Sequence, residues 1–183
     1  MMTGSFLRCC VVTWLLGAAL VLATPISSRA QPLWSYKVVN SYPHDVGAFT
    51  QGLVFAEGVL YEGTGGFGRS SVRKVKLETG TILKSRNLPK EIFGEGITLY
   101  ENHIIQLTWR SRVGFVYDKD TFEPVREFNY PREGWGITND GERLIMSDGT
   151  STLYFLDPRT FETLGQLEVT DNTGPVSALN ELE

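Results

Sequence analysis

Short runs of apolar or alternating apolar and polar residues dominate the chain, and few stretches have the periodicity of a helix. Gly, Asn, Asp and Pro separate these runs, as they separate strands in sheet proteins. The pattern therefore predicts an all-β protein. The expected strands are Tyr36–Tyr42, Gly52–Ala56, Gly58–Gly65, Ser71–Leu77, Gly96–Tyr100, His103–Trp109, Val113–Asp118, Arg143–Asp148 and Thr152–Asp157.

The strands recur in sets that begin with a shared motif. FTQGLVF starts at Phe49, FGEGITL starts at Phe93, and a looser copy, EGWGITN, starts at Glu133. The motif is an aromatic residue, any residue, Gln or Glu, and Gly, followed by apolar residues. Its glycines are Gly52, Gly96 and Gly136, which lie 44 and 40 residues apart.

A second motif follows each copy of the first and predicts a tight turn between two antiparallel strands. Its threonines, Thr79, Thr121 and Thr160, are 42 and 39 residues apart. A period near 40 with about four short strands per unit is typical of a β-propeller. A β-sandwich is the competing architecture, but it does not explain two motifs that recur in phase.

The number of repeats predicts an incomplete propeller of about three blades. The third repeat ends near Asp171, and LNELE at Leu179–Glu183 would begin a fourth inner strand. Three blades cannot close a ring and would leave an unpaired strand edge. We therefore expect residues 31–183 to form a partial propeller domain truncated at its C-terminus, with the strand at Tyr36 completing a missing last blade.

The first thirty residues resemble a secretory signal peptide. Arg8 precedes the apolar run Cys9–Ala23, and small residues at Ser28 and Ala30 suggest cleavage before Gln31. The alternative is an uncleaved membrane anchor, for which the run is short. We expect an exported protein, periplasmic or secreted, with no membrane attachment after cleavage.

The composition of residues 31–183 excludes several kinds of chemistry. Cys9 and Cys10 are the only cysteines, so cleavage would leave no disulfide or thiolate. The 15 basic and 21 acidic side chains that remain give a net charge of about −6, without a basic cluster that could bind nucleic acid. His44 and His103 are isolated, so a zinc site is not expected.

Equivalent positions of successive blades converge at one end of a propeller's central channel. The recurring motif would therefore bring Phe49, Phe93 and Trp135 together, with Trp109 added from the end of a second strand. Such rings can form a dry, rigid pocket for a small group. The alternative is that they only pack one blade against the next.

Gln51 and Glu95 occupy the position between the aromatic residue and the glycine. Burial among aromatic rings would raise the pKa of Glu95, because desolvation disfavours its anion, and so suit it to proton transfer near neutral pH. The alternative is a solvated channel residue or a member of a satisfied polar network.

Several motifs resemble those of the glutaminyl-peptide cyclotransferases of the plant and bacterial type, also called glutamine cyclotransferases. The resemblance extends from about Tyr36 to the end of the chain and implies the five-bladed propeller of that family. The motifs are FTQGL, LYEGTG, FGEGIT, QLTW, GWGIT, SDG and LNELE.

The resemblance implies a transferase of the acyltransferase class that converts an N-terminal glutamine of a peptide or protein into pyroglutamate and releases ammonia. Glu95 corresponds to the family's catalytic acid and base. The family needs no cofactor and no metal, and we expect the full-length protein to be a monomer. The substrate-binding positions carried over from the family are Phe49, Gln51, Phe93, Trp109, Trp135 and Asn180.

Two other functions are compatible with the sequence. One is a non-catalytic, secreted propeller that serves as a binding module, and the other is an inactive fragment. The family places a further tryptophan and a lysine beyond the position at which this chain ends, so the activity of the 183-residue form is open.

Overall fold

The computed structural model describes residues 35–183, which contain three four-stranded antiparallel sheets and one short hairpin. Each sheet is built from strands that follow one another in the sequence, so neighbouring strands are joined by short turns. The first sheet contains β1 (Thr50–Ala56), β2 (Val59–Thr64), β3 (Ser71–Lys76) and β4 (Thr81–Asn87); the second contains β5 (Gly94–Tyr100), β6 (His103–Thr108), β7 (Val113–Asp118) and β8 (Pro124–Asn129); the third contains β9 (Ile137–Asn139), β10 (Leu144–Ser147), β11 (Thr152–Leu156) and β12 (Thr163–Glu168).

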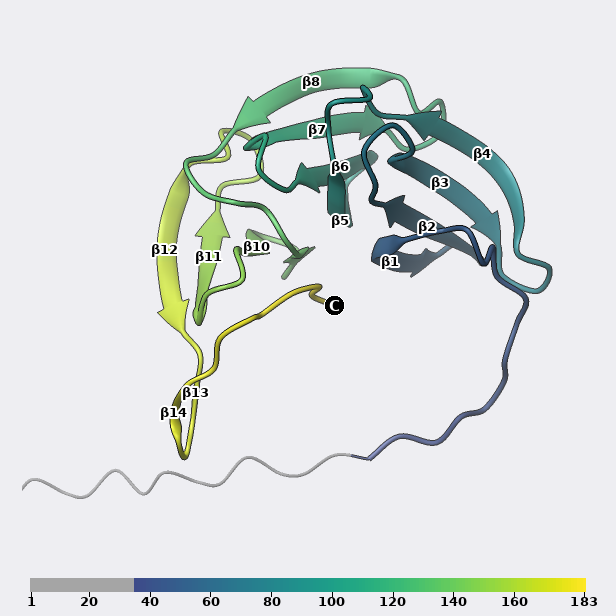
Figure 1. Cartoon of the computed structure of the whole chain (residues 1–183). Coiled ribbons are helices and arrows are strands. Elements are labelled where there is room, and N and C mark those ends of the chain that lie inside the picture. The colour runs from purple at the N-terminus through teal and green to yellow at the C-terminus, as the bar shows by residue number, and fades with distance from the viewer. Residues whose placement is uncertain (1–34) are drawn as a thin grey trace, which may run out of the picture. The chain divides into compact units, whose positions relative to one another are not determined.

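The three sheets lie side by side as the blades of a partial β-propeller (Figure 1). Strands β1, β5 and β9 are innermost, and β5 contacts both β1 and β9. Strands β4, β8 and β12 are outermost. All three sheets belong to one compact unit, Val39–Glu183. The prediction of an all-β chain with about three propeller blades is confirmed.

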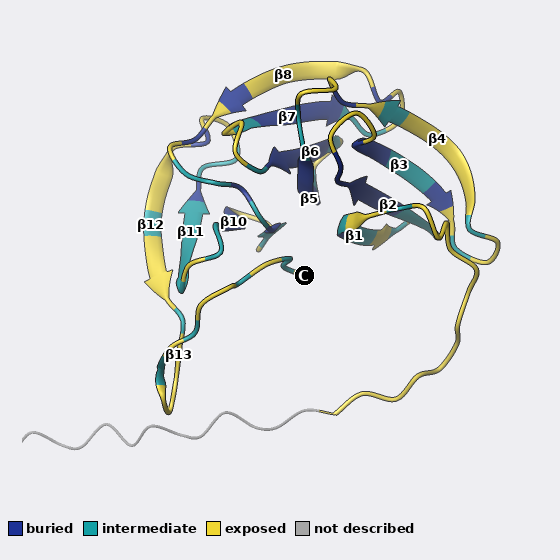
Figure 2. Ribbon diagram, in the orientation of Figure 1, coloured by how far each residue is buried: buried dark blue, intermediate teal, exposed yellow. Residues whose placement is uncertain are grey.

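The core lies between neighbouring blades and is made by their inner and middle strands (Figure 2). One apolar cluster, which includes Tyr61 and Ile97, packs the first blade against the second. Another cluster, which includes Leu107 and Leu144, packs the second blade against the third. The outer strands β4, β8 and β12 are mostly exposed. Burial on both faces of the middle strands therefore explains their nearly continuous apolar runs.

The predicted tight turns join the third and fourth strands of each blade. In the second blade, the Asp118 carboxylate accepts hydrogen bonds from the backbone N–H groups of Asp120 and Thr121. Asp157 does the same for Arg159 and Thr160 in the third blade. This arrangement of an Asp side chain is typical of a tight turn.

The residue after each turn threonine adopts a left-handed backbone conformation. This residue is Gly80 in the first blade, and Phe122 and Phe161 in the other two, with φ values of 67°, 62° and 60°. A phenylalanine pays a steric cost in this conformation. Both rings are nearly buried, at 2% and 6% exposure, so apolar burial offsets that cost.

The prediction of a strand at Tyr36–Tyr42 was wrong. The segment is extended without pairing to any strand of the described chain, and its large side chains, such as Tyr36 and Val39, are exposed. A strand requires a partner edge for its backbone hydrogen bonds, and alternation of residue types alone does not provide one.

The predicted signal peptide lies outside the described residues. No helix within residues 35–183 has the length and apolar character needed to cross a bilayer.

The last part of the described chain returns toward the inner strands. A two-stranded hairpin, β13 (Thr170–Asp171) and β14 (Gly174–Pro175), follows the third blade. Leu179–Glu183, predicted as an inner strand, has no strand pairing. Its backbone at Asn180 and Glu181 nevertheless packs against Gly136, next to the inner strand of the third blade.

The motif glycines are required where the inner strands approach one another. A Cβ atom on Gly52 would lie 2.5 Å from the backbone nitrogen of Ile97, and one on Gly96 would lie 2.8 Å from Cα of Gly136. One on Gly136 would overlap the carbonyl oxygen of Asn180. Each glycine therefore allows the backbone of the next segment to come into contact, which a larger residue would prevent.

We expect Gly96→Ala to lower the free energy of unfolding by about 1–3 kcal/mol, because the added methyl group would overlap backbone atoms that cannot move aside. Gly165→Ala is the matched control, since its Cβ would have no neighbour closer than 3.9 Å. Urea denaturation of the full chain measures both changes. Equal stability of the two variants would show that the inner strands are not closely packed at Gly96.

Candidate active site

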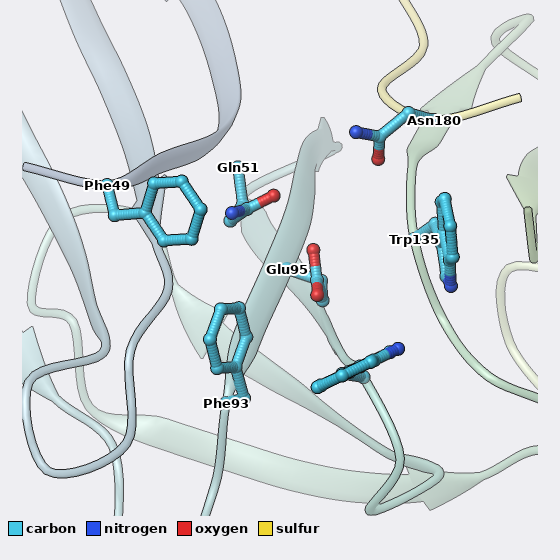
Figure 3. Close-up of a pocket in the computed structure, with 7 residues that line it drawn as sticks. Phe49, Gln51, Phe93, Glu95, Trp135 and Asn180 are labelled. Carbon is cyan, nitrogen blue, oxygen red and sulfur yellow. The ribbon is translucent and has the colours of Figure 1, made fainter. Parts of the chain in front are cut away.

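A cavity of about 220 Å³ opens where the inner strands approach one another (Figure 3). Its volume is below the roughly 300–1,000 Å³ of sites for drug-sized ligands, so it suits a single side chain or a small group. All seven residues that the sequence indicated as catalytic or substrate-binding line it. They are Phe49, Gln51, Phe93, Glu95, Trp109, Trp135 and Asn180.

Two β-bulges explain why Gln51 and Glu95 face the cavity. Gln51 is the extra residue where the pairing of β1 with β2 shifts, between Thr50 and Gly52. Glu95 and Gly96 occupy the corresponding shift in β5, between Gly94 and Ile97. A bulge interrupts the regular alternation of a strand and redirects a side chain, which is a common device beside functional sites.

Aromatic rings from different strands form the apolar wall of the cavity. The Phe93 ring packs edge-on against Phe49 and Trp109, with ring centroids 6.1 Å and 5.7 Å apart. The Trp109 backbone N–H donates to the carbonyl of Phe93, and the Gly134 N–H donates to the carbonyl of Trp109. Backbone hydrogen bonds thus fix the positions from which the rings extend.

Two glycines make room for the largest rings. A Cβ atom on Gly65 would overlap the Phe93 ring, and one on Gly149 would lie 2.7 Å from the indole of Trp135. These glycines lie in the LYEGTG and SDG motifs at the ends of second strands. Their lack of a side chain therefore determines where the walls of the cavity lie.

Glu95 is the buried acid of the cavity, with 7% of its surface exposed. Its carboxyl lies between the side chains of Gln51 and Trp135, with Phe93 and Asn180 on other sides (Figure 3). Burial raises the pKa of Glu95 to about 8, and the negative charge of Glu133 acts in the same direction. Glu95 can therefore hold a proton at neutral pH and exchange it with a bound group.

Glu133 contacts both indoles of the cavity without lining the cavity itself. One of its carboxylate oxygens, Oε2, accepts hydrogen bonds from Nε1 of Trp109 at 2.6 Å and from Nε1 of Trp135 at 3.2 Å. Its other oxygen lies 3.4 Å from Nε of Arg110. The bond from Trp135 is the main cause of a lowered pKa at Glu133, followed by the bond from Trp109 and the charge of Arg110.

Glu181 places a second buried carboxyl close to the motif glycines Gly52 and Gly96. Both of its oxygens are buried without a hydrogen bond of ordinary geometry in the described chain, close to the backbone at Gly52 and Gly96. Burial raises the pKa of Glu181 to about 9; the charges of Glu183 and Glu95 add to this shift. At neutral pH Glu181 is therefore a neutral carboxylic acid.

Sequence reasoning did not identify Glu133, Glu181 or Phe67 as residues of the site. Phe67, which is 62% exposed, packs edge-on against Phe93 at 5.5 Å between centroids. Glu133 opens the third copy of the motif, and Glu181 stands where the other copies have glycine. The positions of Glu133 and Glu181 in the repeat were the only features of the sequence that could have indicated a role for them in the site.

Residues 35–183 contain no cluster of three or more His, Cys, Asp or Glu side chains that could hold a metal ion. The groups that the cavity offers to a bound molecule are one carboxylic acid, two amides and aromatic rings. Such a set can exchange a proton, orient an amide by hydrogen bonds and exclude water from an apolar chain.

Comparison with known proteins identifies similar sequences. A family model described as glutamine cyclotransferase matches residues 11–183. Glutaminyl-peptide cyclotransferase of Arabidopsis thaliana is 44% identical over 149 residues, which are 80% of this chain and 47% of the Arabidopsis protein.

Solved structures extend the comparison to the fold. The crystal structure of Myxococcus xanthus glutaminyl cyclase aligns with a TM-score of 0.73 and 32% identity, over 79% of this chain and 61% of that one. The WD40 domain of Neurospora crassa Pan2 aligns with a TM-score of 0.56 and 16% identity, over 66% of this chain and 36% of that one, which indicates a shared fold alone.

The chain spans about half the length of the Arabidopsis protein and about three fifths of the Myxococcus chain. The family model matches nearly the whole of it, residues 11–183. The chain therefore belongs to the glutamine cyclotransferase family.

Proposed function

We propose that this protein converts the N-terminal glutamine of peptides into pyroglutamate, with Glu95 as general acid and base. The observation that carries the proposal is the convergence of Glu95, two amides and four aromatic rings on one small cavity. The names of the Arabidopsis and Myxococcus relatives, a glutaminyl-peptide cyclotransferase and a glutaminyl cyclase, support the same reaction.

In this reaction the α-amine of the substrate attacks the carbon of its own side-chain amide. A new C–N bond closes a five-membered lactam, and the bond to the amide nitrogen breaks. The attacking nitrogen loses two protons as it changes from an ammonium group to the nitrogen of the lactam. The departing nitrogen gains one before its bond breaks, and the released ammonia takes up the other as ammonium.

In this proposal Glu95 carries protons between these two nitrogens. As a carboxylate it accepts a proton from the α-ammonium, which makes the amine nucleophilic, and as an acid it returns a proton to the leaving nitrogen. Its pKa of about 8 is close to that of an α-amine, about 7.7–8.0, so neither transfer is strongly uphill. A matched pKa is the condition under which such catalysis is efficient.

Gln51 and Asn180 supply the neutral polar groups of the cavity. Their amide N–H groups can donate to the substrate amide oxygen, on which negative charge develops when the ring closes. The rings of Phe93, Trp109 and Trp135 hold the glutamine side chain in a curled conformation. Such a conformation brings the two reacting atoms together before the reaction begins.

The substrate class is the N-terminus of a peptide or protein, because a cavity of about 220 Å³ suits a single side chain. We also propose that the protein is exported, because residues 1–30 have the composition of a signal peptide. A monomeric state of the full-length protein is likewise proposed.

We expect Glu95→Gln to reduce turnover of a Gln-initiated peptide by roughly 10²–10⁴-fold, because the amide cannot carry a proton between the two nitrogens. Ammonia release from the 183-residue chain measures the rate, and circular dichroism checks the fold. Glu168→Gln, on the exposed strand β12, is the matched control and should retain full activity. Equal rates for Glu95→Gln and the unmodified protein would remove Glu95 from the mechanism.

The pH profile of kcat/KM should have an acidic limb near pH 8. Glu95 must be ionised to accept the proton, and its raised pKa means that the ionised fraction falls about tenfold for each pH unit below 8. An ordinary glutamate would place this limb near 4.5. Initial rates between pH 5 and 9 at low substrate concentration test this, and a flat profile between pH 5 and 7 would contradict the assignment.

A further inference from the structure

Two tryptophans from different blades share one carboxylate oxygen. Trp109 follows β6 of the second blade and Trp135 precedes β9 of the third blade, and both indole N–H groups donate to Oε2 of Glu133. Each indole has a single donor, so one oxygen atom satisfies both. The two rings thereby acquire a fixed orientation relative to one another.

Arg110 adds a positive charge to this arrangement. Its guanidinium carbon lies 3.9 Å from the centre of the Trp109 ring, and its Nε lies 3.4 Å from the second oxygen of Glu133. The guanidinium therefore contacts Trp109 and Glu133 together. Two indole hydrogen bonds and an ion pair with Arg110 therefore hold the carboxylate, although its side chain is 35% exposed.

We propose that Glu133 is a positioning residue: its carboxylate holds Trp109 and Trp135 as walls of the cavity at the spacing that a curled glutamine side chain requires. The proposal rests on the proposed function for its substrate. It assigns to Glu133 no contact with the reacting atoms, since Glu133 does not line the cavity.

The charge of Glu133 also acts on Glu95. The titratable groups that face Glu95 are Glu133 before β9, Glu181 in the C-terminal segment and Tyr130 after β8. Glu181 and Tyr130 have raised pKa values and are neutral near pH 7, whereas the pKa of Glu133 is lowered and it is ionised. Glu133 is therefore the fixed negative charge that disfavours ionisation of Glu95.

The alternative hypothesis is that Glu133 is a surface glutamate without any effect on the site. Glu123 provides the comparison, because its carboxylate lies 3.2 Å from Nη1 of Arg86 and its side chain is 72% exposed. It is not among the residues that line the cavity. Glu123→Gln therefore reproduces the loss of an Arg-paired charge without the loss of indole partners.

The first experiment observes the indole N–H signals by NMR in the absence of substrate. Trp109→Phe and Trp135→Phe assign the two signals. Glu133→Gln should shift both of them, because an amide oxygen is a weaker acceptor than a carboxylate and can be shared less well. In the unmodified protein both signals should also move together on acidification below pH 4.5, as Glu133 gains a proton.

The second experiment measures kinetics with a Gln-initiated peptide. We expect Glu133→Gln to lower kcat/KM by roughly 10–100-fold, as is typical when the groups around a reacting centre are displaced by about 1 Å. The acidic limb of the pH profile should move to lower pH, because Glu95 then ionises more easily. Glu123→Gln should leave the rate and the pH profile unchanged.

The two experiments separate the positioning role from the cyclase function. Unchanged indole signals in Glu133→Gln, with normal turnover, would overturn the positioning role alone. Shifted signals in a protein that releases no ammonia would support the contact of Glu133 with both indoles and contradict cyclase activity of the 183-residue chain. A loss of activity in Glu133→Gln without movement of the acidic limb or the indole signals would also overturn the proposal, because a general loss of structure would account for it.

Discussion

The contact between neighbouring inner strands is the constraint on which the rest of the structure depends. Gly52, Gly96 and Gly136 allow successive segments to touch at the same level of the propeller. The residue immediately before each glycine is thereby brought to a common space, which is why Gln51, Glu95 and Trp135 meet although they lie about 40 residues apart. Because backbone atoms set these distances, the cavity does not depend on long, flexible side chains for its shape.

The difference between Gln51 and Glu95 follows from this closeness. Two carboxyl groups in one small cavity would raise each other's pKa and compete for one proton. An amide at Gln51 keeps a hydrogen-bonding group there without a second titration. The ionised acid, Glu133, lies outside the cavity and is satisfied by indole and guanidinium donors. The site thus separates a carboxyl whose pKa lies near neutral pH from one that keeps its charge.

The repeat in the sequence predicted the blades and the convergence of the motif residues on one site, whereas Asn180 was indicated only by the resemblance to the family. Equivalent positions in a propeller converge, so the alignment of FTQGL with FGEGI was enough to place Gln51 beside Glu95. The contacts of Glu133 could not be predicted, since they depend on the rotamers of two indoles from different blades. Glu181 was missed because it replaces the glycine of the repeat, and the repeat does not predict where the side chain of a residue at that position lies. Tyr36–Tyr42 was predicted wrongly because alternation describes a strand but does not supply the edge to which it pairs.

The two buried carboxyls make folding a proton-binding reaction. In the unfolded chain Glu95 and Glu181 ionise near 4.5, whereas in the folded protein their pKa values are about 8 and 9. Their protonated forms are favoured by the fold, so the stability that they contribute is complete below pH 4.5 and is lost as the pH rises through 8 and 9. The exposed turn aspartates, such as Asp118 and Asp157, have lowered pKa values and act in the opposite sense in more acidic solution. Mildly acidic surroundings therefore favour the native state most, and the chain takes up hydrogen ions from a neutral buffer as it folds.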